Sequence, residues 1–422
     1  MTRCRLALAA LLFLVPAWTI VAPPAMAEAP PHSGNSVFDR VVDLVNEHFY
    51  APAELPQFNA AAALAVAQMP DLKDADPAVL GDAIAFVVKS LNASHTGRLT
   101  ADQVDYYELS DVFGFALRRD MRRLYPPQGE VNYAGIGISS AKIDGKIFVT
   151  HVYDGGPAAS AGLMAGDEII SVDGQPFSEI AVFRGKAGHM AQLLVRRQAG
   201  STPIAVDVPV QQVQPGDLFV KSISDSVKRL DQDGHRIGYI RLWTYTREAV
   251  TRVLYDELGK GRLKDVDGLV LDLRSKWGGA PGDAAETFVG QAADMETVDR
   301  DGTRDYAVFR WHKPVVAIID GGTRSGMELL AHSLKENGVP LVGAATAGNV
   351  LAGTTYLLPD DSLLELAVED VLVDGGQRLE NHPVEPDVAV PFDVRYAAGR
   401  DPQLDAATAL MAQRLEHGGS TN

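Results

Sequence analysis

The sequence contains one cysteine, Cys4, among its 422 residues. Because Cys4 lies in the extreme amino-terminal segment, the rest of the chain lacks thiols, which excludes disulfide bonds, a cysteine nucleophile and thiolate metal sites there. A chain of this length buries a core large enough to fold without disulfides. Aromatic residues make up only 7% of the chain, so its core must consist mainly of aliphatic side chains.

Basic residues are also few relative to acidic ones. The chain has 38 Lys and Arg against 55 Asp and Glu, a formal net charge of −17. Such a chain is a poor candidate for binding nucleic acid or an anionic membrane surface. No histidine shows metal-ligand spacing such as His-Glu-x-x-His, so the sequence implies no metal and no cofactor.

The first residues have the pattern of an export signal. Arg3 and Arg5 precede an apolar stretch broken by Pro16, and Ala25–Ala27 offers small residues for cleavage. The alternative is an uncleaved membrane anchor, which Pro16 and the short apolar core disfavour, since a spanning helix needs about 20 apolar residues. We therefore predict a signal peptide over residues 1–27 and an exported protein, periplasmic or secreted. No later segment of the sequence is apolar enough to span a bilayer.

The pattern of apolar residues divides the remainder into three parts. Residues 28–130 are predicted to form a helical domain, because their apolar positions fall on one helical face. Residues 131–214 contain short β-rich runs separated by Gly and Asp turns, which indicates a small β domain. Residues 215–422 alternate strands with helices, which is typical of an α/β domain. The fold class is thus an α+β multi-domain chain.

Two runs in the third part, Gly268–Leu273 and Val315–Ile319, are apolar except for Asp272, as expected of buried parallel strands. Helices are predicted over Pro281–Gln291, Gly326–Asn337 and Gln403–Leu415.

The β domain holds five glycine-containing segments in a characteristic order. That order resembles a PDZ domain of the kind found in proteases. The resemblance implies that Gly135, Ile136, Gly137 and Ile138 bind a peptide carboxylate through backbone N–H groups. The alternative is a generic β domain whose glycines only form turns. The segments are Gly135–Ile138, Gly156–Ala159, Ala161–Leu163, Gly166–Ile170 and Val172–Gly174.

Three segments of the last part resemble the carboxyl-terminal processing proteases and their tricorn relatives. This resemblance implies a ClpP/crotonase-like α/β catalytic domain and serine peptidase activity. We read Asp272 and Arg274 as shaping the glycine turn that follows them, with substrate binding by Arg274 as the alternative. The segments are Gly268–Arg274 with Gly278–Gly279, Asp320–Glu328, and Val342–Asn349.

By this resemblance Ser325 is the nucleophile, placed between a buried strand and a helix. A helix amino terminus favours a developing oxyanion, and the N–H groups of Gly326 and of Gly278 or Gly279 are expected to bind it. The alternative is that Ser325 is only a helix N-cap, the commonest role of serine at such a position.

The base departs from the processing-protease pattern. Where those enzymes have a lysine this chain has Asn349, and their supporting glutamine falls on Gly353. An amide is not a usable base, which disfavours a Ser–Lys dyad. The tricorn relatives instead use a Ser-His pair and a distant Glu, and three residues match them by position: Ser94, His95 and Glu380. His95 is then the general base, and Ser94 and Glu380 orient it. Glu385 is the nearest rival of Glu380.

The sequence therefore predicts an exported serine endopeptidase acting through an acyl-enzyme, with polypeptide substrates or peptide C-termini as partners. Its PDZ domain either binds substrate C-termini or gates the site. The alternative is a catalytically inactive peptide- or ligand-binding protein that keeps the protease fold. A third hypothesis is an adaptor protein that acts through its PDZ domain, with the catalytic domain serving only as a scaffold. Whether the chain forms a homo-oligomer stays open.

Overall fold

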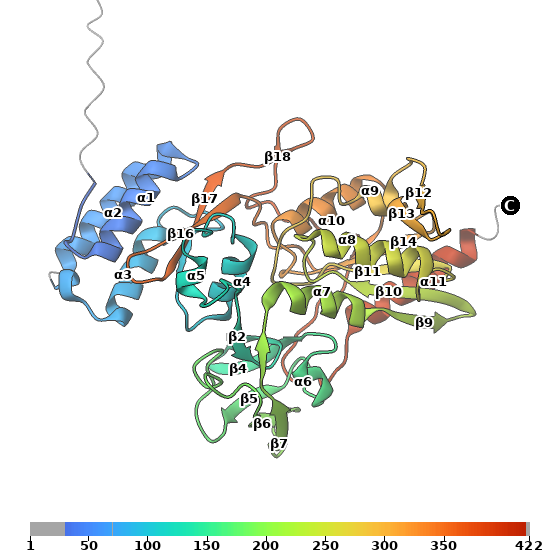
Figure 1. Ribbon diagram of the computed structural model, residues 1–422, viewed down its shortest axis with the longest axis horizontal. Coiled ribbons are helices and arrows are strands. Elements are labelled where there is room, and N and C mark those ends of the chain that lie inside the picture. The colour runs from blue at the N-terminus through green and yellow to red at the C-terminus, as the bar shows by residue number, and fades with distance from the viewer. Residues whose placement is uncertain (1–29, 70, 419–422) are drawn as a thin grey trace, which may run out of the picture.

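The computed structural model describes residues 30–69 and 71–418, so the predicted signal peptide at 1–27 lies outside the described residues. Figure 1 shows three regions: the amino-terminal helices at one end, a small β domain below the centre, and an α/β region at the other end. Within the described residues, no helix combines the length and apolar character needed to cross a bilayer.

Three helices open the described chain, and their boundaries follow from local capping. The Asn35 side chain accepts hydrogen bonds at the start of the first helix, and Asp76 does the same for the third, which begins with a proline that fits a first-turn position. The helices are α1 (Ser36–His48), α2 (Leu55–Gln68) and α3 (Pro77–Lys89).

The core of this helical region is completed by a hairpin from far along the chain. Strands β16 (Ala352–Leu357) and β17 (Leu363–Glu369) are antiparallel, and Figure 1 shows them in orange beside the blue helices. Leu364 and Leu366 are fully buried in the same cluster as Phe38 of α1. Strand β1 (Gly97–Leu99) pairs antiparallel with β17, so the segment after α3 is held against the hairpin.

The small β domain is built on one five-stranded antiparallel sheet. Its order is β3-β4-β5-β6-β7, and β2 pairs separately with β8. The aliphatic core predicted from the composition is present, with Val149, Leu193 and Val195 fully buried. The elements are β2 (Tyr133–Gly135), β3 (Ile138–Ile143), β4 (Lys146–Val152), α6 (Pro157–Ser160), β5 (Glu168–Val172), β6 (Met190–Arg196), β7 (Ile204–Pro209) and β8 (Gln211–Val213).

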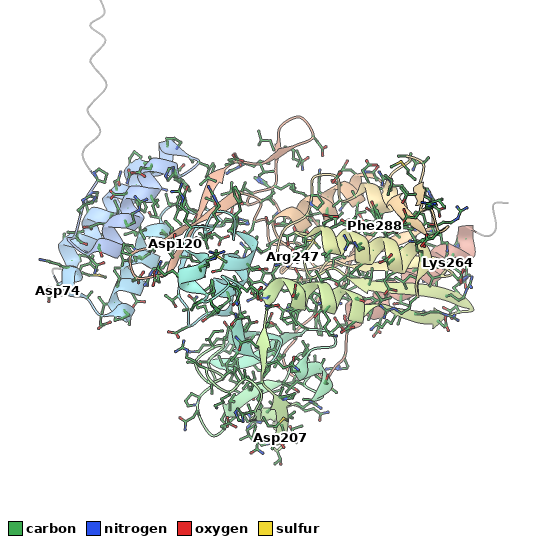
Figure 2. All side chains as sticks on the ribbon, viewed as in Figure 1. Asp74, Asp120, Asp207, Arg247, Lys264 and Phe288 are labelled. Carbon is green, nitrogen blue, oxygen red and sulfur yellow. The ribbon has the colours of Figure 1, made fainter. Side chains whose placement is uncertain are left out.

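Helices α4 (Val104–Val112) and α5 (Met121–Leu124) connect the amino-terminal region to the β domain. Helix α4 also contacts the third region, since Arg247 forms an ion pair with Asp111 at its end. Figure 2 labels Arg247 at the centre of the molecule, where the regions meet, and Asp207 at the tip of the β domain.

The third region contains a six-stranded sheet in the order β20-β15-β14-β11-β10-β9. All neighbours are parallel except β9 and β10. Side chains of α7, α8 and α10 share one core cluster with the sheet, and α11 packs in another. The elements are α7 (Pro215–Ser226), β9 (Lys228–Gln232), β10 (His235–Arg241), α8 (Glu248–Tyr255), β11 (Gly268–Asp272), β14 (Val315–Ile319), α10 (Gly326–Glu336), β15 (Leu341–Gly343), β20 (Val388–Ala389) and α11 (Pro402–Gly418).

The predicted helix over Pro281–Gln291 is wrong in extent. Only a short helix, α9 (Glu286–Val289), forms there, and turns precede it. The backbone next to Gly290 leaves no space for a side chain, since a Cβ on Gly290 would lie 2.4 Å from the Glu286 carbonyl oxygen. The remaining short strands are β12 (Met295–Val298), β13 (Arg304–Val308), β18 (Leu372–Val373) and β19 (Gln377–Arg378).

Candidate active site

Ser325 occupies the junction between the loop after β14 and helix α10. Its backbone has φ 55° and ψ −131°, an unfavourable conformation for a residue with a Cβ. Two contacts hold it, because its N–H donates to the carbonyl oxygen of Asn349 at 2.9 Å and to the carboxylate of Glu328 at 3.2 Å. Backbone strain that persists at a single serine indicates a constrained functional position.

Glu328 organises the loop beneath the serine. Its carboxylate accepts hydrogen bonds from Thr346 Oγ1 at 2.5 Å, from the N–H of Gly348 at 2.7 Å and from the N–H of Asn349 at 2.8 Å. The segment that carries a lysine in processing proteases is therefore fixed to α10 through its backbone. Sequence reasoning missed this role, although the Ser-x-x-Glu spacing from Ser325 is a capping-box signal.

Ser94, His95 and Glu380 form one connected polar chain. Ser94 Oγ lies 2.9 Å from His95 Nδ1 and 2.8 Å from Glu380 Oε2, and the Ser94 N–H donates to Glu380 Oε1 at 3.0 Å. The N–H of Val350 also donates to Glu380 Oε2 at 2.8 Å, so the carboxylate is fixed to the loop behind Ser325. Glu385, the rival acid, is exposed.

The hydrogen bonds that link Glu380, Ser94 and His95 determine which nitrogen of the imidazole carries the proton. An ionised carboxylate accepts hydrogen bonds only, so the single hydroxyl proton of Ser94 goes to Glu380. Ser94 Oγ must then accept a hydrogen bond from Nδ1–H of His95. Nε2 is left unprotonated and available as a proton acceptor, which is the state a general base needs.

His95 and Ser325 line one cavity of about 310 Å³. Among the described residues no hydrogen bond joins their side chains, and catalytic contacts of this kind commonly tighten only when substrate is bound. Gly353 also lines this cavity, and a Cβ on it would lie 3.0 Å from the Cβ of His95. The glycine at the position of the family glutamine therefore leaves the space that the imidazole uses.

The predicted oxyanion donors lie against the serine. Gly278 and Gly279 line the same cavity, and a Cβ on Gly278 would lie 2.3 Å from the Cβ of Ser325. The carbonyl oxygen of Gly279 accepts the N–H of Tyr245, whereas the N–H groups of both glycines lack an acceptor within the described part of the chain. Gly326 is the first residue of α10, so its N–H also lacks an intrahelical acceptor.

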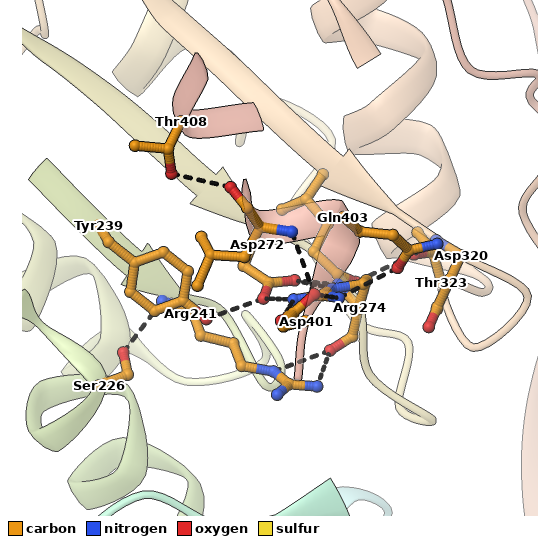
Figure 3. A network of polar contacts seen from close by, with 12 residues as sticks. Ser226, Tyr239, Arg241, Asp272, Arg274, Asp320, Thr323, Asp401, Gln403 and Thr408 are labelled. Carbon is orange, nitrogen blue, oxygen red and sulfur yellow. Dashed lines mark hydrogen bonds and ion pairs between the residues drawn. The ribbon is translucent and has the colours of Figure 1, made fainter. Parts of the chain in front are cut away.

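A buried ionic network supports the turn that carries these glycines (Figure 3). The Arg274 guanidinium donates to Asp272, to Asp401 and to Gln403, and Arg241 donates to the Arg274 carbonyl oxygen. Burial alone would raise the pKa of Asp272, but the two guanidinium groups outweigh it and hold that pKa well below its usual value. With its donors used in this way, Arg274 shapes the turn.

The environment keeps His95 neutral. Burial, and then the positive charge of Arg324, lower the pKa of the imidazole from 6.5 to about 3. Between these values the unfolded chain binds a proton that the folded chain does not, so folded-state stability falls as the pH drops through this window.

We therefore expect His95→Gln to flatten the dependence of the free energy of unfolding on pH between about 6.5 and about 3. Denaturant titrations at several pH values measure this slope, to which one such group contributes at most about 1.4 kcal/mol per pH unit. His189→Gln, at an exposed position of the β domain, is the control. An unchanged slope in His95→Gln would contradict the buried neutral imidazole.

The predicted peptide-binding loop connects β2 to β3. Gly137 has φ +74°, and Gly135, Ile136, Gly137 and Ile138 line a groove with little free space, about 10 Å³. Val104 of α4 lines this groove too. Among the described residues there is no group of three or more His, Cys, Asp or Glu side chains placed to hold a metal ion.

The fold is similar to that of peptidases whose chains carry a PDZ domain. Residues 236–390 match the model of peptidase family S41, and residues 126–187 match the PDZ domain. These matches, together with relatives named as processing proteases and a tricorn protease homolog, confirm the resemblance to processing and tricorn proteases. The predicted fold class, with its helical, PDZ and α/β parts, is confirmed as well.

Curated relatives are identical to this chain at about a quarter of the aligned positions. The carboxy-terminal processing protease CtpB of Bacillus subtilis is 26% identical over 69% of this chain and 62% of its own length. The carboxyl-terminal-processing protease of Picosynechococcus is 27% identical over 72% of this chain and 77% of its own. Tricorn protease homolog 1 of Streptomyces coelicolor is 28% identical over 62% of this chain and 25% of its own.

Solved structures share the fold. The photosystem II D1 C-terminal processing protease superposes with a TM-score of 0.50 at 21% identity, covering 88% of this chain and 99% of its own. The tricorn protease gives a TM-score of 0.51 at 18% identity, covering 90% of this chain and 36% of its own.

Proposed function

We propose that this protein is an exported serine endopeptidase that hydrolyses peptide bonds with a Ser-His-Ser-Glu site. The observation that supports it most is the hydrogen-bonded chain from Glu380 through Ser94 to His95, which ends in the cavity lined by Ser325. The export part of the proposal rests on the signal-peptide pattern of residues 1–27.

In the acylation step, Ser325 Oγ attacks the scissile carbonyl carbon while His95 Nε2 takes the hydroxyl proton. The carbonyl oxygen gains negative charge and accepts hydrogen bonds from Gly326 and from Gly278 or Gly279. The C–N bond then breaks, and the leaving amine takes the proton from His95. Water repeats the sequence on the ester, so that the acid is released and Ser325 is regenerated. Glu380 and Ser94 orient and stabilise the protonated imidazole of His95 that forms transiently.

The PDZ domain is proposed either to bind substrate C-termini or to gate access to the site. Helix α4 supports a gating role, because Val104 lines the peptide-binding groove while Leu109 and Val112 of the same helix line the cavity of Ser325. A peptide entering the narrow groove would have to displace Val104, and that movement would reach the catalytic cavity through the helix.

We expect a fluorophosphonate probe to label the full chain once, at Ser325, because these reagents react with activated serines. Mass spectrometry of the labelled peptide locates the adduct. The Ser325→Ala variant is the negative control, and Ser33→Ala, in the segment before α1, is the matched positive control. A folded protein that takes up no label would instead support the inactive binding protein.

A further inference from the structure

Arg324 directly precedes the proposed nucleophile and lines the same cavity as Ser325 and His95. Its side chain is half-buried. Across residues 30–69 and 71–418, every other arginine that is at least half-buried has a hydrogen-bond or ion-pair partner, such as Arg98 with Asp360 and Arg378 with Asp370. The guanidinium of Arg324 has neither within these residues, so it is an unpaired charge in the wall of the cavity that Ser325 and His95 line.

Two carboxylates line the same cavity, Asp105 of α4 and Glu365 of β17. Asp105 forms an ion pair with Lys276, which leaves Glu365 as the candidate for an internal partner. No ion pair joins the side chains of Arg324 and Glu365 among the described residues. Burial raises the pKa of Glu365, and the charge of Arg324 only partly opposes this effect. A carboxyl group whose ionised form is disfavoured is a poor permanent partner for a guanidinium, so Arg324 keeps its capacity to bind a carboxylate from outside.

The rest of the cavity wall strengthens such binding. Leu99, Leu109, Val112 and Leu351 contribute apolar surface to it. In surroundings of this kind an unpaired charge costs free energy, and a charge-assisted hydrogen bond is stronger than in water. The planar fork of a guanidinium matches a carboxylate through two parallel hydrogen bonds, and arginine stays charged at every relevant pH.

We infer that Arg324 is a specificity-determining residue that binds a carboxylate group of the substrate next to the scissile bond. The inference rests on the proposed peptidase function and names the substrate class of that site: peptides with a carboxylate close to the cleaved bond. This group is either the C-terminal α-carboxylate or an Asp or Glu side chain, which offer the same chemistry to the guanidinium.

A bound carboxylate would also act on the base. After burial, the charge of Arg324 is the second cause of the low pKa of His95. Neutralising that charge raises the basicity of the imidazole only while a carboxylate occupies the site. Carboxylate-bearing substrates are thereby favoured both in binding and in proton transfer.

The test uses the full chain and matched pairs of alkyl fluorophosphonates. One member of each pair carries a carboxylate at a set distance from phosphorus, the other its methyl ester, and chain lengths of two to eight methylenes are compared. The measured quantity is the ratio of the second-order rate constants for labelling Ser325. It is determined for wild type, Arg324→Gln, Arg324→Lys and the control Arg300→Gln, whose side chain is exposed between β12 and β13.

For at least one length we expect wild type to prefer the acid by roughly 10- to 100-fold, as charge-assisted hydrogen bonds allow. The ratio should fall to about 1 in Arg324→Gln, stay partly elevated in Arg324→Lys and remain at the wild-type value in Arg300→Gln. Thermal unfolding of each variant shows that it is folded. Labelling without any acid preference, or a preference that survives in Arg324→Gln, would overturn the inference. No labelling by any probe would contradict the proposed function itself.

The two sources of the carboxylate are separated with reduced casein as substrate. Mass spectrometry of the fragments made by wild type and by Arg324→Gln compares the cut positions. Loss of cuts near chain ends in the variant assigns the α-carboxylate, and loss of internal cuts beside Asp or Glu assigns the side chain. Identical cut positions in the two proteins would count against Arg324 as a determinant of specificity.

Discussion

Replacing His95 with alanine is expected to lower kcat for peptide hydrolysis by roughly 10⁴- to 10⁶-fold, the range seen when the base of a serine peptidase is removed. Without the imidazole the chain from Glu380 through Ser94 leads to no proton acceptor beside Ser325. A neutral serine hydroxyl is a weak nucleophile. Without a base to take its proton, Ser325 attacks the peptide carbonyl much more slowly. The rate of fluorophosphonate labelling should fall in parallel with kcat.

The control for this variant is His189→Ala, which removes an exposed imidazole from the β domain. Its kcat should stay within about twofold of wild type, since exposed substitutions away from a site have small effects. Circular dichroism of both variants separates loss of chemistry from loss of fold. If His95→Ala kept more than about a tenth of the wild-type kcat, the base would have to be another group.

The second large effect is expected for Glu380→Gln, with kcat reduced by roughly 10²- to 10⁴-fold. The amide keeps the size of the carboxylate but offers only one accepting oxygen, whereas Glu380 accepts from the Ser94 hydroxyl and from the N–H groups of Ser94 and Val350. The donating end of the amide then faces one of these donors, and the tautomer of His95 is no longer fixed.

Glu385→Gln is the matched control, because it makes the same chemical change five positions later at an exposed site. Steady-state kinetics should show wild-type kcat for this variant. The effect of Glu380→Gln should lie in kcat more than in KM, because Glu380 orients the base and lies outside the lining of the catalytic cavity. The reverse order of the two variants would reassign the acidic member to Glu385.

Local pattern was sufficient for the two central strands of the sheet. The run Gly268–Leu271 is continuously apolar and lies in the fully buried strand β11, and Val315–Ile319 becomes β14 in the same way. Such strands are readable because both of their faces are covered, so almost every position must be apolar. The prediction of a helix over 281–291 was wrong in extent, because helix propensity is a weak guide where the packing of neighbouring turns determines the backbone conformation.

Contacts between distant segments were not readable from periodicity. The β16–β17 hairpin completes the hydrophobic core of the amino-terminal helices, which lie about 300 positions earlier in the sequence. The local sequence of neither segment predicts that the two pack together. The roles of Glu328 and Val350 in fixing the loop behind Ser325 were missed for the same reason. Each of these contacts joins residues that are far apart in the sequence and close together only in the folded protein.

The sequence by itself determined the order of the parts and the aliphatic core, because these follow from composition and periodicity. The candidate residues came from the resemblance of its motifs to those of processing and tricorn proteases. Only the tertiary structure decided which acid meets the base, since Ser94 and Glu380 are 286 positions apart and hydrogen-bond through folding alone. Among the residues that the structure describes, it also left Arg324 beside Ser325 without a hydrogen-bond or ion-pair partner, because the pairing of a charge depends on where folding places the opposite charges.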